Sequence, residues 1–303
     1  MWSSRIAEIG LARGKCAVRW GGQRVTGRML PVSVPAPVPA SPECWTAPLA
    51  ALDVWLASLG QSTQRSRPAL SIALGLDAAH FFRLPWTEAL RDFRKAPQLA
   101  AAQFTMQFAA SPATGSAAAA APEAFAYWVE DAPPGAPRLA CAVEQALLTG
   151  LDEMAKRRKT RIVSVAPWVV TALNRHASRL PANGWFAAME RDHLAVVTLS
   201  DGVAHEIAVA PWSRCEASGT SNWQVALKAV IGRTALRSGR AEELPLAVLD
   251  VSDTSVVSGM GDLSDVLLKH FVTPEHIALA QSVGASACAL DELPARIVPD
   301  VAT

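Results

Sequence analysis

Residues 161–212 narrow the possible folds of this chain more than any other segment. The segment begins with a β-branched run at residues 161–166 that ends at Pro167, and proline suits a strand end because it cannot donate to a strand ladder. A short helix follows, with apolar residues spaced three and four apart. Three more strands come next, and the Ser200-Asp201-Gly202 turn between the last two is a strong hairpin signal. The segment therefore predicts a strand, a helix and a three-stranded meander.

The same order of elements occurs twice along the chain. A meander, a helix and further strands and helices are predicted at residues 5–30, 43–60 and 70 onward, and again at residues 185–212, 222–237 and 246 onward. A repeat of this size indicates a duplicated α/β subdomain and not a short-period solenoid. We therefore expect two lobes with a cleft between them.

We place the division between the two lobes at residues 143 and 144. The N-terminal lobe, residues 1–143, contains a proline-rich connector at residues 31–42 and a low-complexity excursion at residues 110–122. The C-terminal lobe is residues 144–303, and it opens with a helix that precedes the strand at residue 161.

Composition excludes several classes of protein. Half of the 303 residues are apolar and 18% are charged, which is typical of a packed globular protein. With 28 basic and 27 acidic residues the chain has no long-range attraction to nucleic acid or anionic lipid. No stretch approaches the ~18 apolar residues that span a bilayer, so we expect no direct membrane insertion. Five scattered cysteines without CxxC spacing predict neither disulfides nor a zinc site, and a reducing cytoplasm is the expected compartment.

Short segments of the chain resemble a known family. Residues 6–10, Ile-Ala-Glu-Ile-Gly, stand where that family begins with an Asp-Ile-Gly-like phosphate turn. Residues 69–74 and 81–85 are similar to its strand pair ending in a Leu-Pro step, and residues 161–174 resemble its strand, proline and helix before the second meander. The family is the actin-like assembly proteins of type IV pili and type II secretion, PilM and the cytoplasmic part of GspL. The resemblance implies an α/β, two-lobed actin-like (ribonuclease-H-like) fold with a duplicated meander and helix subdomain.

The resemblance also implies a function and a partner. We expect a scaffold protein of an inner-membrane assembly platform, which binds the cytoplasmic tail of a membrane protein of the pilus or secretion system. It would be cytoplasmic and peripheral to the inner membrane through that partner, and self-association is left open. GspL-like members carry a transmembrane helix after this domain and the present sequence does not, which leads us to expect either a PilM-like soluble role or a split-gene arrangement. The alternative is an ATP-binding ATPase or kinase of the same fold.

The first nucleotide-binding turn of such a fold is partly present. Glu8, Gly10 and Lys15 are the candidate residues, with glutamate where the family has aspartate. Phosphate binding of this type needs glycine-containing hairpin turns whose backbone N–H groups point at phosphate oxygens. An ordinary hairpin with a surface lysine explains the same residues, and we favour that interpretation. If a cofactor binds, we expect ATP with Mg²⁺.

The remaining nucleotide turns are weaker. The second turn, residues 190–193, has carboxylates but no glycine, and Gly259 and Gly261 are the candidate residues for the adenosine loop. No phosphate-binding loop, zinc-protease motif or nucleophile elbow is found, and the six histidines are dispersed. A ribonuclease-H-like nuclease would need Glu8, Glu190 and Asp250 to converge on metal ions, which we do not favour. We therefore predict no catalytic residue and no metal ligand.

Overall fold

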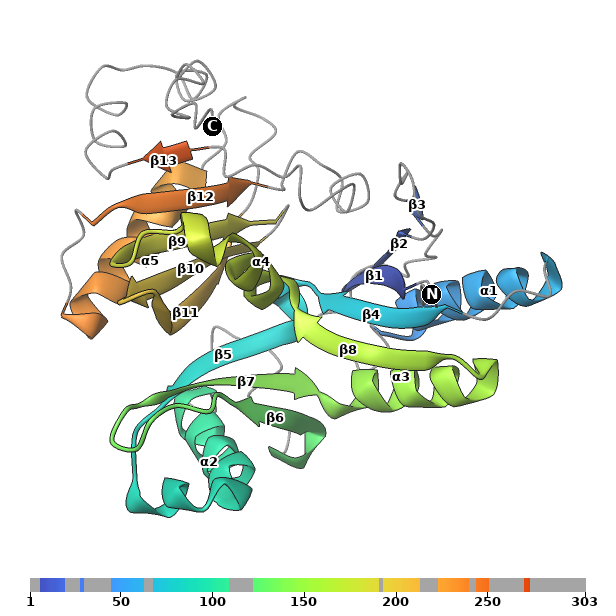
Figure 1. Ribbon diagram of the computed structural model, residues 1–303, viewed down its shortest axis with the longest axis horizontal. Coiled ribbons are helices and arrows are strands. Elements are labelled where there is room, and N and C mark those ends of the chain that lie inside the picture. The colour runs from blue at the N-terminus through green and yellow to red at the C-terminus, as the bar shows by residue number, and fades with distance from the viewer. Residues whose placement is uncertain are drawn as a thin grey trace, which may run out of the picture.

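The computed structural model describes most of the chain as three β-sheets with helices packed against them. The described residues are 6–19, 28–29, 45–62, 68–108, 122–190, 193–212, 223–239, 244–250 and 270–272. The candidate residues Gly259 and Gly261 therefore lie outside the described part, as do the connector at 31–42 and most of the excursion at 110–122. Figure 1 shows the three sheets arranged around a common junction.

The first sheet contains the strands of the N-terminal meander. In spatial order β3-β2-β1-β4-β8, its strands are β3 (Arg28–Met29), β2 (Lys15–Arg19), β1 (Ile6–Ala12), β4 (Ala69–Leu74) and β8 (Arg161–Pro167). β1 is antiparallel to β2 and parallel to β4, and β4 is parallel to β8. Along β4, buried and half-buried residues alternate, which is the pattern of a strand with one face on a core.

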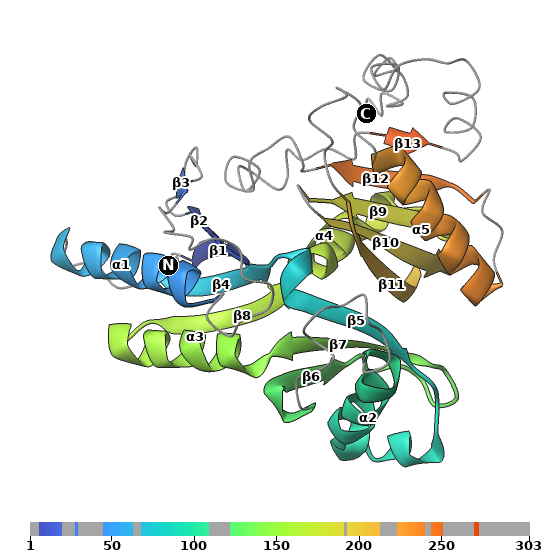
Figure 2. The ribbon, with the colours of Figure 1, turned by 180° about the vertical axis from the view of Figure 1, so that it is seen from behind.

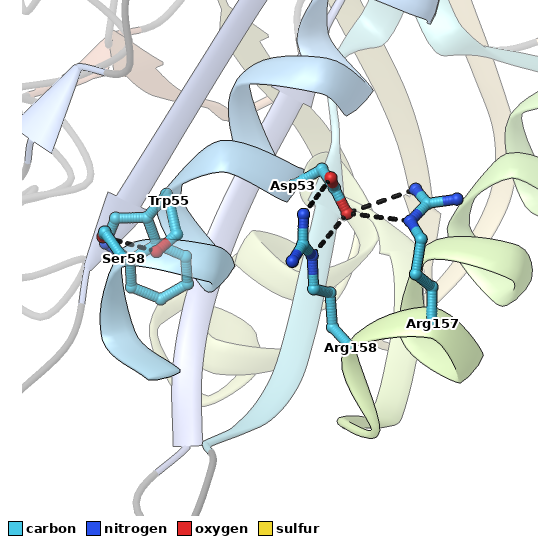
Figure 3. A network of polar contacts seen from close by, with 5 residues as sticks. All are labelled: Asp53, Trp55, Ser58, Arg157 and Arg158. Carbon is cyan, nitrogen blue, oxygen red and sulfur yellow. Dashed lines mark hydrogen bonds and ion pairs between the residues drawn. The ribbon is translucent and has the colours of Figure 1, made fainter. Parts of the chain in front are cut away.

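Two helices lie along this first sheet, α1 (Thr46–Ser62) and α3 (Gln145–Arg158) (Figure 1). Their apolar side chains share one core cluster with Ile9, Leu70 and Ile72 of the strands. The helices are joined to each other by Asp53 of α1, which accepts hydrogen bonds from Arg157 and Arg158 of α3 (Figure 3). The basic run at the end of α3 therefore contributes two of its cations to helix packing.

The second sheet repeats the topology of the first over four of its five strands. In spatial order β11-β10-β9-β12-β13, its strands are β11 (Val203–Pro211), β10 (His193–Ser200), β9 (Gly184–Met189), β12 (Leu246–Asp250) and β13 (His270–Val272). β9 is antiparallel to β10 and parallel to β12, as β1 is to β2 and β4. This repetition confirms the predicted duplication and the α/β fold class.

Both faces of the second sheet are covered. Helix α5 (Trp223–Ser238) packs on one face through a cluster that includes Trp185 and Leu227 (Figure 2). On the opposite face, Phe186 and Val197 belong to the same core cluster as the first sheet. The two duplicated halves therefore share apolar core, which the sequence pattern alone does not predict.

A third, smaller sheet is inserted between β4 and α3. In spatial order β5-β7-β6, its strands are β5 (Ala79–Leu84), β7 (Arg138–Glu144) and β6 (Phe125–Val129). Helix α2 (Ala96–Phe108) packs on it, and Phe104 of that helix contacts the rings of Phe82 and Phe125. The sequence predicts these strands but not that they form a sheet of their own.

Short connecting elements complete the fold. They are the 3₁₀ turns η2 (Leu76–Ala78), η3 (Glu88–Arg91), η4 (Phe93–Lys95), η7 (Pro122–Ala124) and η8 (Ala177–Arg179), and the helix α4 (Trp168–His176). Among the residues that the structure describes, no helix combines the length and the apolar character needed to cross a bilayer. Cys16 and Cys141 are free thiols, and burial raises the pKa of each to about 12, so both are poor nucleophiles.

The sheet to which the strands belong changes twice in this part of the chain. It changes from the third sheet to the first after Glu144, and from the first to the second after Pro167. β8 pairs with β4 as an edge strand of the first sheet among the described residues, and α3 packs beside α1. The physical reason for this return to the first sheet is the parallel βαβ connection from β4 to β8, which the inserted third sheet interrupts in sequence. A division of the chain into two folding domains remains a prediction.

Candidate functional site

The turn between β1 and β2 is formed by Arg13 and Gly14. Gly14 has φ +67°, the left-handed region that favours glycine. Gly10, a candidate nucleotide-binding residue, lies in the buried interior of β1, opposite Ala17 and Ala73. The chain reverses at Gly14, and a nucleotide-binding role for Gly10 stays a prediction.

The other two candidate residues of the first turn, Glu8 and Lys15, lie in different strands. Glu8 lies half-buried in β1, with its Cα opposite Ser71 of β4, four residues before Ala12 at the end of the strand. Lys15 begins β2 and pairs with Ala12 at the turn. The structure therefore places Lys15 at the turn and Glu8 away from it.

Arg13 connects the first turn to three other elements. Its backbone N–H donates to Oδ2 of Asp77 at 2.8 Å, and its guanidinium contacts Oε1 of Glu144 at 2.7 Å. The other carboxylate oxygen of Glu144 accepts a hydrogen bond from Nε1 of the buried Trp45 at 2.8 Å. The turn is thereby tied to η2, to the start of α3 and to the start of α1.

A close backbone approach holds η2 against the same turn. The N–H of Gly75 donates to the carbonyl of Leu11 at 2.7 Å. A Cβ atom at Gly75 would lie 2.8 Å from the Cβ of Ala12 and 2.8 Å from Oδ1 of Asp77, which is closer than such atoms can approach. Glycine at position 75 is therefore required for η2 to reach the turn.

Glu190, at the end of β9, brings the second hairpin turn to η2 as well. Both of its carboxylate oxygens lie 3.1 Å from the backbone nitrogen of Leu76, which donates to them. Its own backbone N–H donates to the carbonyl of His193 at 2.8 Å, and its carbonyl accepts from Nε1 of Trp212 at 2.9 Å. Arg191 and Asp192 of this turn lie outside the described residues.

The two duplicated hairpin turns thus converge on η2, and at each contact a carboxylate of the chain accepts a backbone hydrogen bond. Asp77 accepts from the N–H of Arg13, and Glu190 accepts from the N–H of Leu76. A phosphate oxygen would compete with a carboxylate for each of these donors. Within the described residues no group of acidic, histidine or cysteine side chains has the arrangement of a metal site.

His80 links this site to the third sheet. It is the second residue of β5, the strand that follows η2, and its ring lies 5.8 Å from the rings of Phe104, Phe108 and Phe125. Burial, and to a smaller extent the charge of Arg13, lower the pKa of His80 to about 4, against an opposing effect of the Glu144 carboxylate. At neutral pH the imidazole is therefore uncharged.

Sequence reasoning missed several residues of this site. Asp77 lies 64 residues from its partner Arg13, and Glu144 lies 131 residues from it. The local signal for Asp77 was weak, an acidic residue two positions after a glycine at a strand end. The sequence indicated that Glu190 belongs to a turn without glycine, but it did not predict the contact with Leu76.

An apolar cleft of about 570 Å³ opens beside the junction, where the three sheets meet. It is bordered by the ends of β4 and β8, by β6 and β7, by α4 and η8, and by the β10–β11 hairpin. Trp128 of β6 and Val203 of β11 line it and are 46% and 51% exposed. Among the strands that the structure describes, β6 and β8 are at the edges of their sheets, each with one neighbouring strand, and both border the cleft.

Comparison with known proteins identifies the fold. No protein-family model matches the chain, and no curated protein matches it. Among solved structures, the cytoplasmic domain of EpsL, an inner membrane component of the type II secretion system of Vibrio cholerae, is similar with a TM-score of 0.51 and 13% identity, over 89% of this chain and 97% of that one.

Two further structures are similar at lower scores. A Bacteroides thetaiotaomicron protein with an actin-like ATPase fold has a TM-score of 0.47 and 11% identity, over 92% of this chain and 96% of that one. A chain of the PilM-PilN type IV pilus biogenesis complex has a TM-score of 0.47 and 13% identity, over 92% of this chain and 75% of that one. The resemblance inferred from the sequence is confirmed at the level of the fold, and the chain has the two-lobed actin-like fold.

Proposed function

We propose that this protein is an actin-like scaffold of a bacterial inner-membrane assembly platform, of type II secretion or of type IV pili, that does not turn over nucleotide. The observation that carries the proposal is the pair of hydrogen bonds by which η2 contacts the two hairpin turns. The backbone N–H groups of Arg13 and Leu76 already donate to Asp77 and Glu190. Displacing these carboxylates with a phosphate would leave their charges partly buried, which is unfavourable. The fold shared with EpsL supports the choice of system.

The partner in this proposal is the cytoplasmic tail of an inner-membrane protein, and the protein reaches the membrane through it. The apolar cleft is the proposed binding site. An extended segment can add to an edge strand such as β6 or β8, while its alternate side chains enter apolar pockets. Trp128 is suited to anchor such a segment, because a half-exposed indole gains much by being covered.

A matched pair of variants tests the cleft. Candidate tails, made as peptides from bitopic membrane proteins encoded near this chain, are titrated against the purified protein. We expect one of them to bind, and Val203→Asp to weaken that binding at least tenfold. Val225→Asp is the control, because Val225 is 54% exposed on α5 and does not line the cleft. Binding that survives Val203→Asp, or no binding by any tail, would refute the proposal.

The alternative, an ATP-binding enzyme, is tested by thermal unfolding with magnesium and ATP. A ligand present at ~100 times its dissociation constant adds ~2.7 kcal/mol to the free energy of unfolding. We expect no shift at millimolar ATP. A clear shift would favour the enzyme, and Lys15→Ala would then show whether the first turn is responsible.

A further inference from the structure

The main chain of Glu190 is held by hydrogen bonds within the second sheet, and its side chain extends away from that sheet. Its backbone N–H and carbonyl are both used, the first by the carbonyl of His193 and the second by the indole of Trp212. Trp212 is itself buried at the end of β11 and belongs to the cluster under α5. The main chain of Glu190 is therefore positioned by two neighbouring strands.

From this fixed position the side chain crosses to a different part of the fold. Its carboxylate accepts from the N–H of Leu76, which is 114 residues earlier in the chain and lies between β4 of the first sheet and β5 of the third. Glu190 is only 7% exposed. A carboxylate this buried is retained without penalty only where it is hydrogen-bonded, so the contact with Leu76 has structural consequence.

The contact continues to the other hairpin turn through the same short element. Next to Leu76, Asp77 accepts from the N–H of Arg13, and Gly75 donates to Leu11. A continuous series of hydrogen bonds thus runs from the second turn through η2 to the first turn. A rotation of one duplicated half against the other would have to break this series at Leu76 or at Arg13.

We propose that Glu190 is a latch that holds the second sheet against η2 and so fixes the angle between the two halves of the molecule. The role is conformational, and it does not depend on the identity of a partner. It goes beyond the scaffold proposal, because a protein with this latch could serve any partner that requires one fixed arrangement of the halves.

The test measures amide hydrogen exchange at Leu76 in the full chain. Glu190→Ala removes the acceptor, and Glu190→Asp keeps the charge but withdraws the carboxylate by one methylene. We expect exchange at Leu76 to rise on the order of tenfold or more in either variant, since a hydrogen bond to a charged group is lost. Small-angle X-ray scattering should show a larger radius of gyration in the same variants.

Glu206→Ala is the matched control. It removes a carboxylate that pairs with Arg237 of α5 within the second half, at 2.6 Å, and does not connect two sheets. We expect wild-type exchange at Leu76 in this variant. If Glu190→Ala does not fold, Glu190→Asp decides the question. Wild-type protection of Leu76 in Glu190→Asp, or equal loss in Glu206→Ala, would overturn the proposal. Peptide binding tests the scaffold proposal and amide exchange at Leu76 tests the latch proposal. Either proposal can therefore be refuted without the other.

Discussion

The two five-stranded sheets have the same strand order around their central strands but occupy different environments. The central strand β9 of the second sheet is buried at all six positions, whereas its counterpart β1 in the first sheet includes an exposed and a half-buried residue, and β4 beside it alternates between buried and half-buried residues. The fifth strand also differs, because β8 runs parallel to its neighbour and β13 runs antiparallel. One topology therefore serves both as a two-sided core sheet and as a sheet packed mainly through one face.

The hairpin turns of the two halves have diverged into complementary roles. The first turn provides a backbone N–H, at Arg13, to a carboxylate from elsewhere. The second turn provides the carboxylate, Glu190, to a backbone N–H from elsewhere. The two topologically equivalent turns thus contribute a donor on one side and an acceptor on the other, and both contact η2.

The largest effect is expected from the two-sided sheet. Phe186→Ala should lower the free energy of unfolding by about 3–5 kcal/mol, because a fully buried ring leaves a cavity between tightly packed layers. Urea denaturation measures the loss. Ser71→Ala on β4 is the comparison, and it should change stability by less than about 1 kcal/mol, since its hydroxyl pairs with Ser164 at an exposed position. Equal losses would show that the two sheets are not packed differently.

The next largest effect is expected in the pH dependence of stability, and it arises from His80 of the third sheet. The folded-state pKa of His80 is lowered to about 4, below its ordinary value of 6.5. The unfolded chain therefore binds the proton more readily, and stability present above pH 6.5 is lost as the pH falls toward 4. The loss should approach about 3 kcal/mol.

The pH effect is measured by unfolding at several pH values in the wild type and in His80→Phe. The variant keeps an aromatic ring beside Phe104 and should lack this part of the pH dependence. Identical pH profiles would mean that His80 does not titrate differently on unfolding.

The anchoring of the first turn gives a smaller effect. Glu144→Ala removes the acceptor of the buried Trp45 indole and the ion-pair partner of Arg13. Stability should fall by about 1–3 kcal/mol, because a buried donor is left unsatisfied. The control is Glu153→Ala, at an exposed position of α3, the helix that follows Glu144. If both variants lose equally little, the Trp45 and Arg13 contacts do not stabilise the turn.

The smallest effect concerns the helices that cover the first sheet. Hydrogen bonds from Arg158 and then Arg157 hold the pKa of Asp53 below its ordinary value of 3.8 (Figure 3). The stabilisation is present above that value and disappears as the pH falls through the lowered pKa. Asp53→Ala should cost only about 0.5–1 kcal/mol at neutral pH, since the arginines are solvated. The loss should shrink further in high salt, and a salt-independent loss would contradict an ionic origin.

The sequence predicted the meander of the second sheet well, because its signals are local. Asp201 and Gly202 have φ of +52° and +77°, as a tight hairpin turn requires, and the flanking apolar runs are continuous. The repeated order of elements was likewise visible as two copies of one pattern. The membership of β8 in the first sheet was not, because its pairing with β4 spans an inserted sheet.

The junction could be predicted only in part for the same reason. Its contacts join residues 64 to 131 positions apart, and no periodicity links Asp77 to Arg13 or Glu144 to Arg13. What the sequence did show was the lack of a glycine at residues 190–193. That observation indicated a changed turn, but the new partner of Glu190 depended on the tertiary fold.

The close approach at Gly75 has a consequence for how this chain can vary. The residues from Gly75 to Ala78 touch the first turn, the second turn and the start of the third sheet within a single short stretch. A library of substitutions should therefore show its steepest intolerance there, with Gly75→Ala already excluded by steric overlap. The walls of the apolar cleft include the half-exposed Trp128 and Val203, whose side chains can be exchanged at lower steric cost. If the cleft binds a partner as we propose, it is the place to redesign, and η2 is the place to leave unchanged.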